Sequence, residues 1–229
     1  MEKDYIHKVY PRKLERTDFW GQIKRTVNGR PVSEEEIDLI VNQIVSQLEI
    51  KRYDNLLDLG CGNAALSSRI FGMLDKYTGV DFSEYLIGIA NEYFRVSESI
   101  DFKVSDILAY VKEDDAPQSF SKVLCYGAMT YISKIDFITM MRILHDRFTN
   151  VERIFIGNIP ERSKAKEFYS KRGVTDYQLD DPGSAIGVWW GQDEIIQAME
   201  DIGYKPIISR MPESFYTASY RFDITLLVG

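Results

Sequence analysis

The stretch Leu-Leu-Asp-Leu-Gly-Cys-Gly-Asn-Ala at residues 56–64 decides the fold. Its first half is an apolar run with one acid, as in a buried strand, and its second half is a glycine turn that leads into a predicted helix over 64–74. Glycine lets the backbone approach a ligand closely because it has no Cβ. Ligands of open α/β sheets bind at the carboxyl ends of strands, so we expect a binding site at this turn.

Beyond residue 53, short apolar runs alternate with helical stretches. The apolar runs lie at 55–59, 77–80, 100–104, 122–126 and 154–157, and the helical stretches at about 64–74, 84–95, 106–112 and 136–148. Parallel neighbours need a crossover connection, so this order predicts a parallel sheet with covering helices. A further helix at about 192–202 precedes two strands, 206–211 and 220–228, and their short connection predicts an antiparallel hairpin.

The sequence therefore predicts an α/β fold: a Rossmann-like, doubly wound, mostly parallel sheet of seven strands that ends in an antiparallel hairpin. Apolar and polar residues alternate in the last strand, which indicates two unequal faces. Near the N-terminus, Ser33 caps a predicted helix with Glu36 three residues on.

No repeat or linker marks a boundary between independent domains. We expect one compact domain over 53–229, with residues 1–52 as a helical appendage that acts as a lid. The stretch 159–190 is too long for a plain connection and is rich in aromatic residues, which predicts a second lid inserted in the domain.

Three acids follow successive strands of the predicted sheet. Asp58 lies at the end of the first strand, Asp81 ends the second, and Asp106 follows the third. Singly, each could cap a helix. Together they form a row beside the glycine turn, where Asp81 has the spacing of a carboxylate that binds ribose hydroxyls.

The segment Asp58-Leu59-Gly60-Cys61-Gly62 resembles the first motif of the class I S-adenosylmethionine (SAM)-dependent methyltransferases, and the resemblance extends over about 53–229. It implies SAM as the cofactor and a set of donor-binding residues. By resemblance these are Asp58 for the methionine amino group, the backbone of Gly60, Cys61 and Gly62 for the methionyl and ribose parts, Asp81 for the ribose hydroxyls, Phe82, Asp106 and Ile107 for adenine, and Cys125 and Tyr126 beside the sulfonium.

Two alternatives to this interpretation stay open. A nicotinamide-dependent oxidoreductase also fits Gly60-x-Gly62-x-x-Ala65 and Asp81, but its strands would all be parallel, and Asp58 would repel its pyrophosphate. A SAM-binding module without catalysis would carry the same motif.

The acceptor has no motif of its own, because methyl transfer depends mainly on holding donor and acceptor in line. The Asp/Asn-Pro-Pro-aromatic motif of amino-methylating nucleic-acid enzymes is replaced by residues 126–129, and Asn158 to Pro160 is interpreted as a turn. We expect metal-independent transfer to a hydroxyl or amine of a small molecule. A sugar or glycoconjugate is one candidate, since the rings of the 159–190 lid would stack on it.

Candidate side chains around the acceptor come from several segments. His7 is the candidate general base, and Tyr131, with Tyr126, is a candidate hydrogen-bonding partner of the acceptor. Arg25 is a candidate for the methionine carboxylate, with a surface position as the alternative. The acceptor walls are predicted at 5–25, with aromatic residues such as Tyr10, Phe19 and Trp20, and at 159–190.

Composition limits the partners. A net charge of −7 without a basic patch disfavours nucleic acid. The absence of a leader-like or membrane-spanning apolar run favours a cytoplasmic protein without a membrane partner. Two cysteines and two histidines, none at metal-ligand spacing, predict no metal site.

Overall fold

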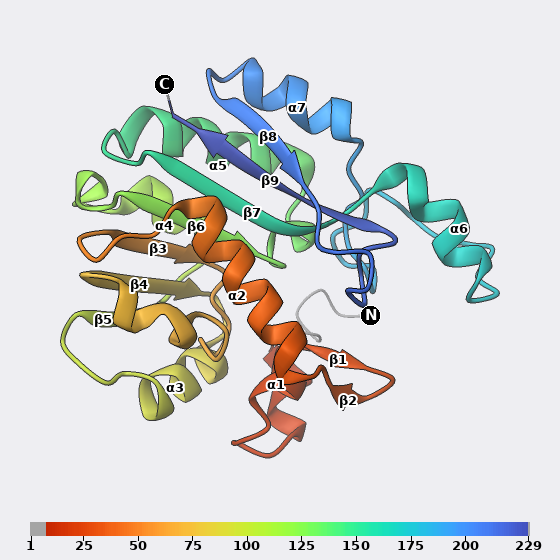
Figure 1. Ribbon diagram of the computed structural model, residues 1–229, viewed down its shortest axis with the longest axis horizontal. Coiled ribbons are helices and arrows are strands. Elements are labelled where there is room, and N and C mark those ends of the chain that lie inside the picture. Colours follow the sequence, from red (N-terminus) through yellow and green to blue (C-terminus); the bar gives the residue numbers. More distant parts are fainter. Residues whose placement is uncertain (1–7, 229) are drawn as a thin grey trace.

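A seven-stranded sheet in the order β5-β4-β3-β6-β7-β9-β8 forms the centre of the computed structural model, which describes residues 8–228 (Figure 1). The strands β3 to β7 are parallel to one another, and β9 is antiparallel to both β7 and β8. The predicted sheet with its closing antiparallel hairpin is therefore confirmed. Its strands are β3 (Asn55–Leu59), β4 (Lys76–Asp81), β5 (Ile100–Val104), β6 (Lys122–Tyr126), β7 (Arg153–Pro160), β8 (Lys205–Ser209) and β9 (Arg221–Leu227).

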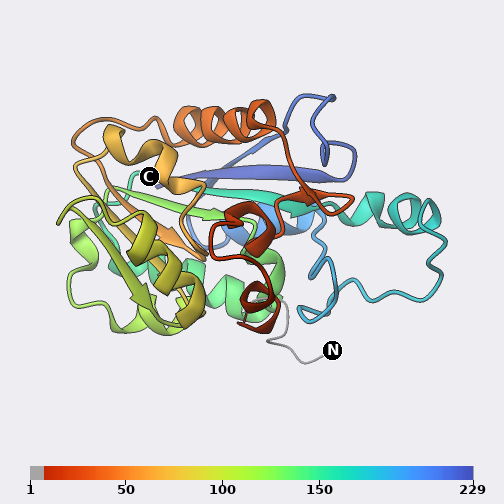
Figure 2. The ribbon, with the colours of Figure 1, turned by 90° about the horizontal axis from the view of Figure 1, so that it is seen from below.

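Helices cover both faces of this sheet (Figure 2). One face carries α2, the 3-10 helix η3 and α3, and the other carries α4, α5 and α7. The helices are α1 (Phe19–Gln22), α2 (Glu34–Leu48), α3 (Glu84–Tyr93), α4 (Ile107–Glu113), α5 (Lys134–Arg147), α6 (Ala165–Ser170) and α7 (Gln192–Glu200). Shorter elements are the strands β1 (Thr26–Val27) and β2 (Arg30–Pro31) and the 3-10 helices η2 (Pro11–Lys13), η3 (Ser67–Met73), η4 (Pro117–Ser119), η5 (Met129–Tyr131) and η6 (Arg162–Lys164).

The chain builds the sheet outward from β3 in two directions. It runs from β3 through β4 to the edge strand β5, then crosses to β6 on the other side of β3. Connections leave β3 and β6 in opposite directions, so a crevice opens between their carboxyl ends. This switch point is where the glycine turn lies.

The helix predicted over 64–74 is wrong in its type and its start. Residues 61–66 form turns, and only the 3-10 helix η3 follows. Gly60, Gly62 and Ala64 have φ angles of 79°, 59° and 62°. A right-handed helix requires negative φ, so this left-handed path delays the helix.

Helix α2 begins as predicted at Ser33, whose Oγ accepts from the N–H of Glu36 at 3.3 Å. The Glu36 carboxylate does not accept a hydrogen bond from the Ser33 N–H, as it would in a capping box. Its Oε1 instead accepts from the Tyr216 N–H at 3.2 Å. Helix α2 therefore fixes the position of the 210–220 connection between β8 and β9, which is longer than the short hairpin loop that was predicted.

The two faces of β9 differ as predicted, but both are buried. Its polar side chains Asp223 and Thr225 are 2% and 0% exposed. They lie under α2, where Gln43 Nε2 donates to Asp223 Oδ2 at 3.5 Å and Thr225 Oγ1 donates to Gln47 Oε1 at 2.7 Å. The polar face of the strand thus binds a helix rather than water.

The division at residue 52 stays a prediction, although α2 shares a hydrophobic cluster with the sheet. Helix α6 projects from the main body (Figure 1). Within residues 8–228, no helix has the length and apolar character needed to cross a membrane.

Candidate active site

A cavity of about 360 Å³ lies at the switch point between β3 and β6. Its size is in the range of small-molecule sites. Most of the residues predicted from the sequence line it: Arg25, Asp58, Gly60, Cys61, Gly62, Asp81, Phe82, Asp106, Ile107, Tyr126 and Tyr131. Of the remaining two, Cys125 does not line it, and His7 lies outside the described residues.

The glycine turn forms a wall of bare backbone. The N–H groups of Gly60 and Cys61 donate to Val80 O at 2.8 and 3.1 Å, which ties the turn to β4. A Cβ on Gly60 would lie 2.2 Å from the Ala128 side chain, and one on Gly62 would lie 2.9 Å from Ile23. Both positions therefore require glycine for their positive φ and for their close packing.

Asp58 is a buried carboxylate at the centre of the cavity's acidic end. Its Oδ2 accepts from the Tyr77 hydroxyl at 2.7 Å and from Ser67 Oγ. Burial raises the pKa of Asp58 to about 6, against the effect of these hydrogen bonds. A cationic group beside it would favour the ionised carboxylate, as the methionine ammonium of SAM would.

Asp81 is held by two backbone N–H groups. Its Oδ1 accepts from Ser83 N at 2.8 Å, and its Oδ2 accepts from Gly62 N at 3.0 Å. Burial raises the pKa of Asp81, and these two bonds oppose the rise. Each carboxylate oxygen has a second lone pair, so both can still accept from a pair of ribose hydroxyls.

Asp106 does cap a helix, and it lines the cavity as well. Its Oδ1 accepts from Leu108 N and Ala109 N at 2.9 and 3.0 Å at the start of α4, which leaves Oδ2 out of these bonds. The ring of Phe82 lies nearby in the lining, with Lys8 Nζ 5.1 Å from its centroid. The side chain of Lys8 thus reaches a ring of the cavity lining, and the role of the appendage as a lid stays a prediction.

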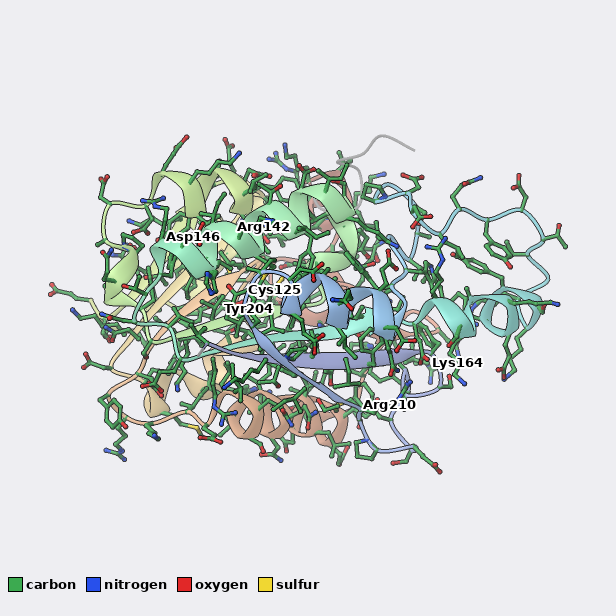
Figure 3. All side chains as sticks on the ribbon, turned by 90° about the horizontal axis from the view of Figure 1, so that it is seen from above. Cys125, Arg142, Asp146, Lys164, Tyr204 and Arg210 are labelled. Carbon is green, nitrogen blue, oxygen red and sulfur yellow. The ribbon has the colours of Figure 1, made fainter. Side chains whose placement is uncertain are left out.

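The prediction that Cys125 lines the cavity is wrong. Its side chain is 1% exposed and packs in the cluster under α5, on the face seen in Figure 3. Successive side chains of a strand point to opposite faces, so Cys125 and Tyr126 cannot both face the cavity. Burial raises the pKa of Cys125 to about 12 and also raises the pKa of Cys61, so both thiols stay protonated at neutral pH.

Arg25 is buried, so the alternative prediction that it lies on the surface is wrong. The residue is 8% exposed and lines the cavity. Its guanidinium lies 4.7 Å from the centroid of the Tyr126 ring, and Nη1 is 3.5 Å from the Tyr216 hydroxyl. Burial of an arginine is costly unless a partner compensates its charge, which makes Arg25 a candidate ligand-binding group.

Asn158 is a cavity residue that the sequence analysis interpreted as part of a turn. It lies instead inside β7, where the register with β9 shifts between Ile156 and Ile159. Its φ is 68°, and its N–H donates to Asp223 Oδ1 at 2.7 Å. Bulges often redirect a side chain beside an active site, and this one brings Asn158 into the lining.

Arg221 is a second cavity residue for which the sequence analysis proposed no role. It begins β9, and its Nη1 donates to the carbonyl oxygen of Asn158. Its guanidinium lies 5.1 Å from the centroid of the Tyr220 ring. The one available signal was a charged residue at the start of a strand in which polar and apolar residues alternate.

Several polar atoms buried at this end make no hydrogen bond within residues 8–228. They are Arg25 Nε, Tyr126 OH, Asn158 Oδ1 and Arg221 Nε. Buried polar groups are nearly always paired in folded proteins, so this concentration indicates a place for a polar ligand.

The aromatic rings of the 159–190 lid do not line the cavity. Phe168, Tyr169 and Trp189 form a separate cluster, in which the Tyr169 and Tyr177 rings stack at 4.1 Å. The lid reaches the cavity through residues 185–186 only. It is tied there by the N–H of Val188, which donates to Thr130 O at 2.7 Å.

The predicted aromatic wall of the appendage is also wrong in its residues. Tyr10, Phe19 and Trp20 are absent from the lining, whereas residues 22–26 belong to it. Phe19 packs against Tyr93 and Phe94 of the α3 region, with ring centroids 5.2 and 5.0 Å apart. These rings stabilise the attachment of the appendage instead of facing a ligand.

Tyr131 lines the cavity from η5. Burial raises the pKa of its hydroxyl, which therefore stays neutral and can donate or accept a hydrogen bond. Within the part of the chain that the structure describes, no three His, Cys, Asp or Glu side chains gather to hold a metal ion.

Comparison with known proteins points to one enzyme class. Residues 56–148 match the family model described as "Methyltransferase domain". The release factor glutamine methyltransferase of Fusobacterium nucleatum is 25% identical over 128 residues, 54% of this chain. The chain spans about a third, 35%, of the length of that curated relative.

Solved methyltransferase structures share the fold. Magnesium protoporphyrin IX methyltransferase from Synechocystis PCC 6803, with bound SAH, aligns with a TM-score of 0.68 and 15% identity over 99% of this chain and 98% of its own. The N-methyltransferase NodS from Bradyrhizobium japonicum WM9 aligns with a TM-score of 0.62 and 11% identity over 86% of this chain and 98% of its own.

The family match over residues 56–148, the sheet order and the motif of the glycine turn support a methyltransferase domain with the class I fold. They also support SAM as the cofactor of the cavity. The oxidoreductase alternative is set aside, because β9 is antiparallel to its neighbours in the sheet.

Proposed function

We propose that this protein transfers the methyl group of SAM to a hydroxyl or amine of a small molecule, without a metal ion. One observation carries the proposal: a single cavity joins an acidic end at the glycine turn to an end lined by tyrosines and arginines. The first suits a cationic donor, and the second, as part of a cavity of about 360 Å³, suits a small-molecule acceptor.

The donor would lie along the carboxyl ends of β3, β4 and β5. Asp58 would face the methionine ammonium, Asp81 would accept from the ribose hydroxyls, and the bare backbone of 60–62 would pass beside both. Phe82 would stack on adenine, with Asp106 Oδ2 and the Ile107 N–H as partners of its ring edge. The N–H of Ile107, in the first turn of α4, has no partner inside the helix.

Arg25 would bind the methionine carboxylate. Its burial and its Nε, which makes no hydrogen bond within residues 8–228, support this role. A guanidinium holds a carboxylate with two parallel hydrogen bonds, which fixes direction as well as position. The donor would then be anchored at both ends, with its methyl group directed toward Tyr126.

The acceptor would lie beyond Tyr126, among the rings of Tyr131, Tyr216 and Tyr220. Catalysis would come from alignment of the acceptor with the methyl group, to which a neutral Tyr131 contributes a hydrogen bond. A general base at His7 stays a prediction. If the acceptor is a sugar, its ring would stack on these tyrosines, because the lid rings Phe168, Tyr169 and Trp189 pack in their own cluster.

The direct test is to denature the purified protein and identify co-purified SAM or S-adenosylhomocysteine (SAH) by mass spectrometry, then to titrate SAH and NAD by calorimetry. We expect one SAH per chain and no heat from NAD. SAH formation with a deproteinised small-molecule extract, but not with protein or nucleic acid, would support the acceptor class. If the protein binds SAH but forms none from SAM with the small-molecule extract, with protein or with nucleic acid, a non-catalytic SAM-binding module is favoured.

A further inference from the structure

The charges that line the cavity are divided between its two ends. The acids Asp58, Asp81 and Asp106 surround the glycine turn, whereas Arg25 and Arg221 lie together at the other end. Asn158 lies between the two arginines. Its carbonyl oxygen accepts a hydrogen bond from Arg221. Its Nδ2 borders Gly127 together with Arg25 Nη2, since a Cβ built on Gly127 would lie 3.5 Å from the first nitrogen and 3.0 Å from the second. This second end, where the donor's carboxylate and the acceptor would meet, is therefore a pocket of positive charge.

Neither arginine forms an ion pair with a carboxylate of residues 8–228. The acid whose titration both of them influence is Asp223. Its two oxygens accept from Asn158 N and Gln43 Nε2, so it supports the bulge instead of pairing with a guanidinium. Two cations at one end of a cavity, both without a paired acid in the described chain, call for an anionic ligand.

The donor supplies one carboxylate, and the proposed function assigns it to Arg25. Arg221 is then left without an anion. Only Nη1 of Arg221 donates within the described chain, to Asn158 O. Its Nε is buried without a hydrogen bond there, whereas Nη2, which donates none there either, is not among the buried atoms. Nη2 is therefore the nitrogen that a carboxylate can reach for a charge-assisted hydrogen bond.

The position of Arg221 is rigidly supported. Arg210 Nη1 donates to the Arg221 carbonyl at 3.1 Å, and Arg210 Nη2 pairs with Glu161. The ring of Tyr220 lies beside the guanidinium, and the Asn158 bulge fixes its other side. A binding group held by the backbone of two strands loses little entropy when its ligand arrives.

We propose, on the basis of the proposed function, that the methyl acceptor carries a carboxylate that binds to Nη2 of Arg221. The rings of Tyr131, Tyr216 and Tyr220 would contact the body of the acceptor. The protein would thus select hydroxy or amino acids with a free carboxylate over their neutral amides. Arg221 is the residue that determines this selection.

The test begins with calorimetric titration of SAH into the full-length protein and continues with benzoate and its neutral analogue benzamide, each titrated into the SAH-saturated protein. Three variants are compared: Arg221→Gln, Arg25→Gln and Arg142→Gln. Arg142 is exposed on α5 and does not line the cavity, so its variant has the same charge change without the proposed contact (Figure 3). Circular dichroism of each variant shows whether it is folded.

We expect benzoate to bind the loaded protein and benzamide to bind at least about tenfold more weakly, the value of one charge-assisted hydrogen bond. Arg221→Gln should abolish the preference for benzoate and leave SAH affinity within about twofold, while Arg25→Gln should weaken SAH and Arg142→Gln should change neither.

Failure of SAH to bind would overturn the proposed function, and this inference with it. If SAH binds, three results overturn the inference alone: no benzoate binding, equal binding of benzamide, or an equal loss of SAH affinity in Arg221→Gln and Arg25→Gln. The last result would assign both arginines to the donor. An unfolded Arg221→Gln is replaced by Arg221→Lys, which keeps the charge but lacks the guanidinium Nη2; it should bind benzoate more weakly than the wild type, and equal benzoate affinity would contradict the inference.

Discussion

The two ends of the cavity are built differently. The donor end comes from one continuous part of the chain, from Asp58 to Ile107, in which each acid lies at or just beyond the carboxyl end of its own strand. The acceptor end, with the adjoining Arg25 proposed for the donor's carboxylate, gathers Asn158 and Arg221 with the loop at 126–132 and the 216–221 segment. Sequence neighbours make the first end, and long-range packing makes the second.

The ends also differ in how their polar groups are satisfied. Asp58 and Asp81 accept hydrogen bonds from their own surroundings, so the donor end is organised before a ligand binds. At the acceptor end, Arg25 Nε, Asn158 Oδ1 and Arg221 Nε have no hydrogen-bond partner within residues 8–228. The donor end is thus an ordered binding surface, and the acceptor end depends on its ligand for full pairing.

The largest effect on this comparison is expected from Asp81→Ala. The variant removes the acceptor of the ribose hydroxyls and leaves the Gly62 and Ser83 N–H groups unpaired. SAH binding should weaken by about 1–3 kcal/mol, or roughly fivefold to 150-fold, when measured by calorimetry. Asp75→Ala, an exposed site just before β4, is the matched control. Unchanged affinity in Asp81→Ala would show that the donor lies elsewhere.

A smaller effect is expected from pH, through Asp58. In the proposed function the ammonium of SAH would bind the ionised carboxylate, and burial raises the pKa of Asp58 to about 6. Affinity should therefore be full at pH 7 and fall as Asp58 takes up a proton, by about tenfold at pH 5. Asp58→Asn should bind more weakly at pH 7 and lack this component of the pH dependence. Identical pH profiles for the two proteins would contradict a contact between Asp58 and the ammonium.

The smallest effect on SAH affinity is expected from Asp223→Asn. This variant tests how Asp223 stabilises the Asn158 bulge at the acceptor end. Burial raises the pKa of Asp223 to about 6 in the folded protein, above its unfolded value. Stability from this group is therefore present below about pH 4 and lost as pH rises through 6. Asn can still accept from the Asn158 N–H.

Urea unfolding at pH 4.5 and pH 7.5 would measure this contribution. From pH 4.5 to pH 7.5, the free energy of unfolding of the wild type should fall by on the order of 1 kcal/mol more than that of Asp223→Asn. SAH affinity at pH 7.5 should be the same in both proteins. Equal losses of unfolding free energy in the two proteins would mean that burial does not raise the pKa of Asp223.

Much of the donor end could be predicted from the sequence. The alternation of apolar runs and helices determined a parallel sheet, because parallel strands need crossovers, and the order of strands then placed Asp58, Asp81 and Asp106 along one edge. The positions of glycine at 60 and 62 follow from local backbone geometry. These features depend on neighbours in the chain, which a sequence shows directly.

The acceptor end was decided by the tertiary structure. Nothing local marks Arg25 as buried, because its burial depends on Tyr126 and Tyr216, which are distant in sequence. The bulge at Asn158 depends on Asp223, a partner 65 residues away.

The lid shows the same limit of sequence patterns. Aromatic residues favour burial but do not specify against what, and the rings of Phe168, Tyr169 and Trp189 pack on one another instead of facing the cavity. The sequence by itself determined the sheet and the donor edge, since both follow from local periodicity and chain order. The tertiary structure decided which cations and rings meet at the acceptor end, since that depends on packing between distant segments.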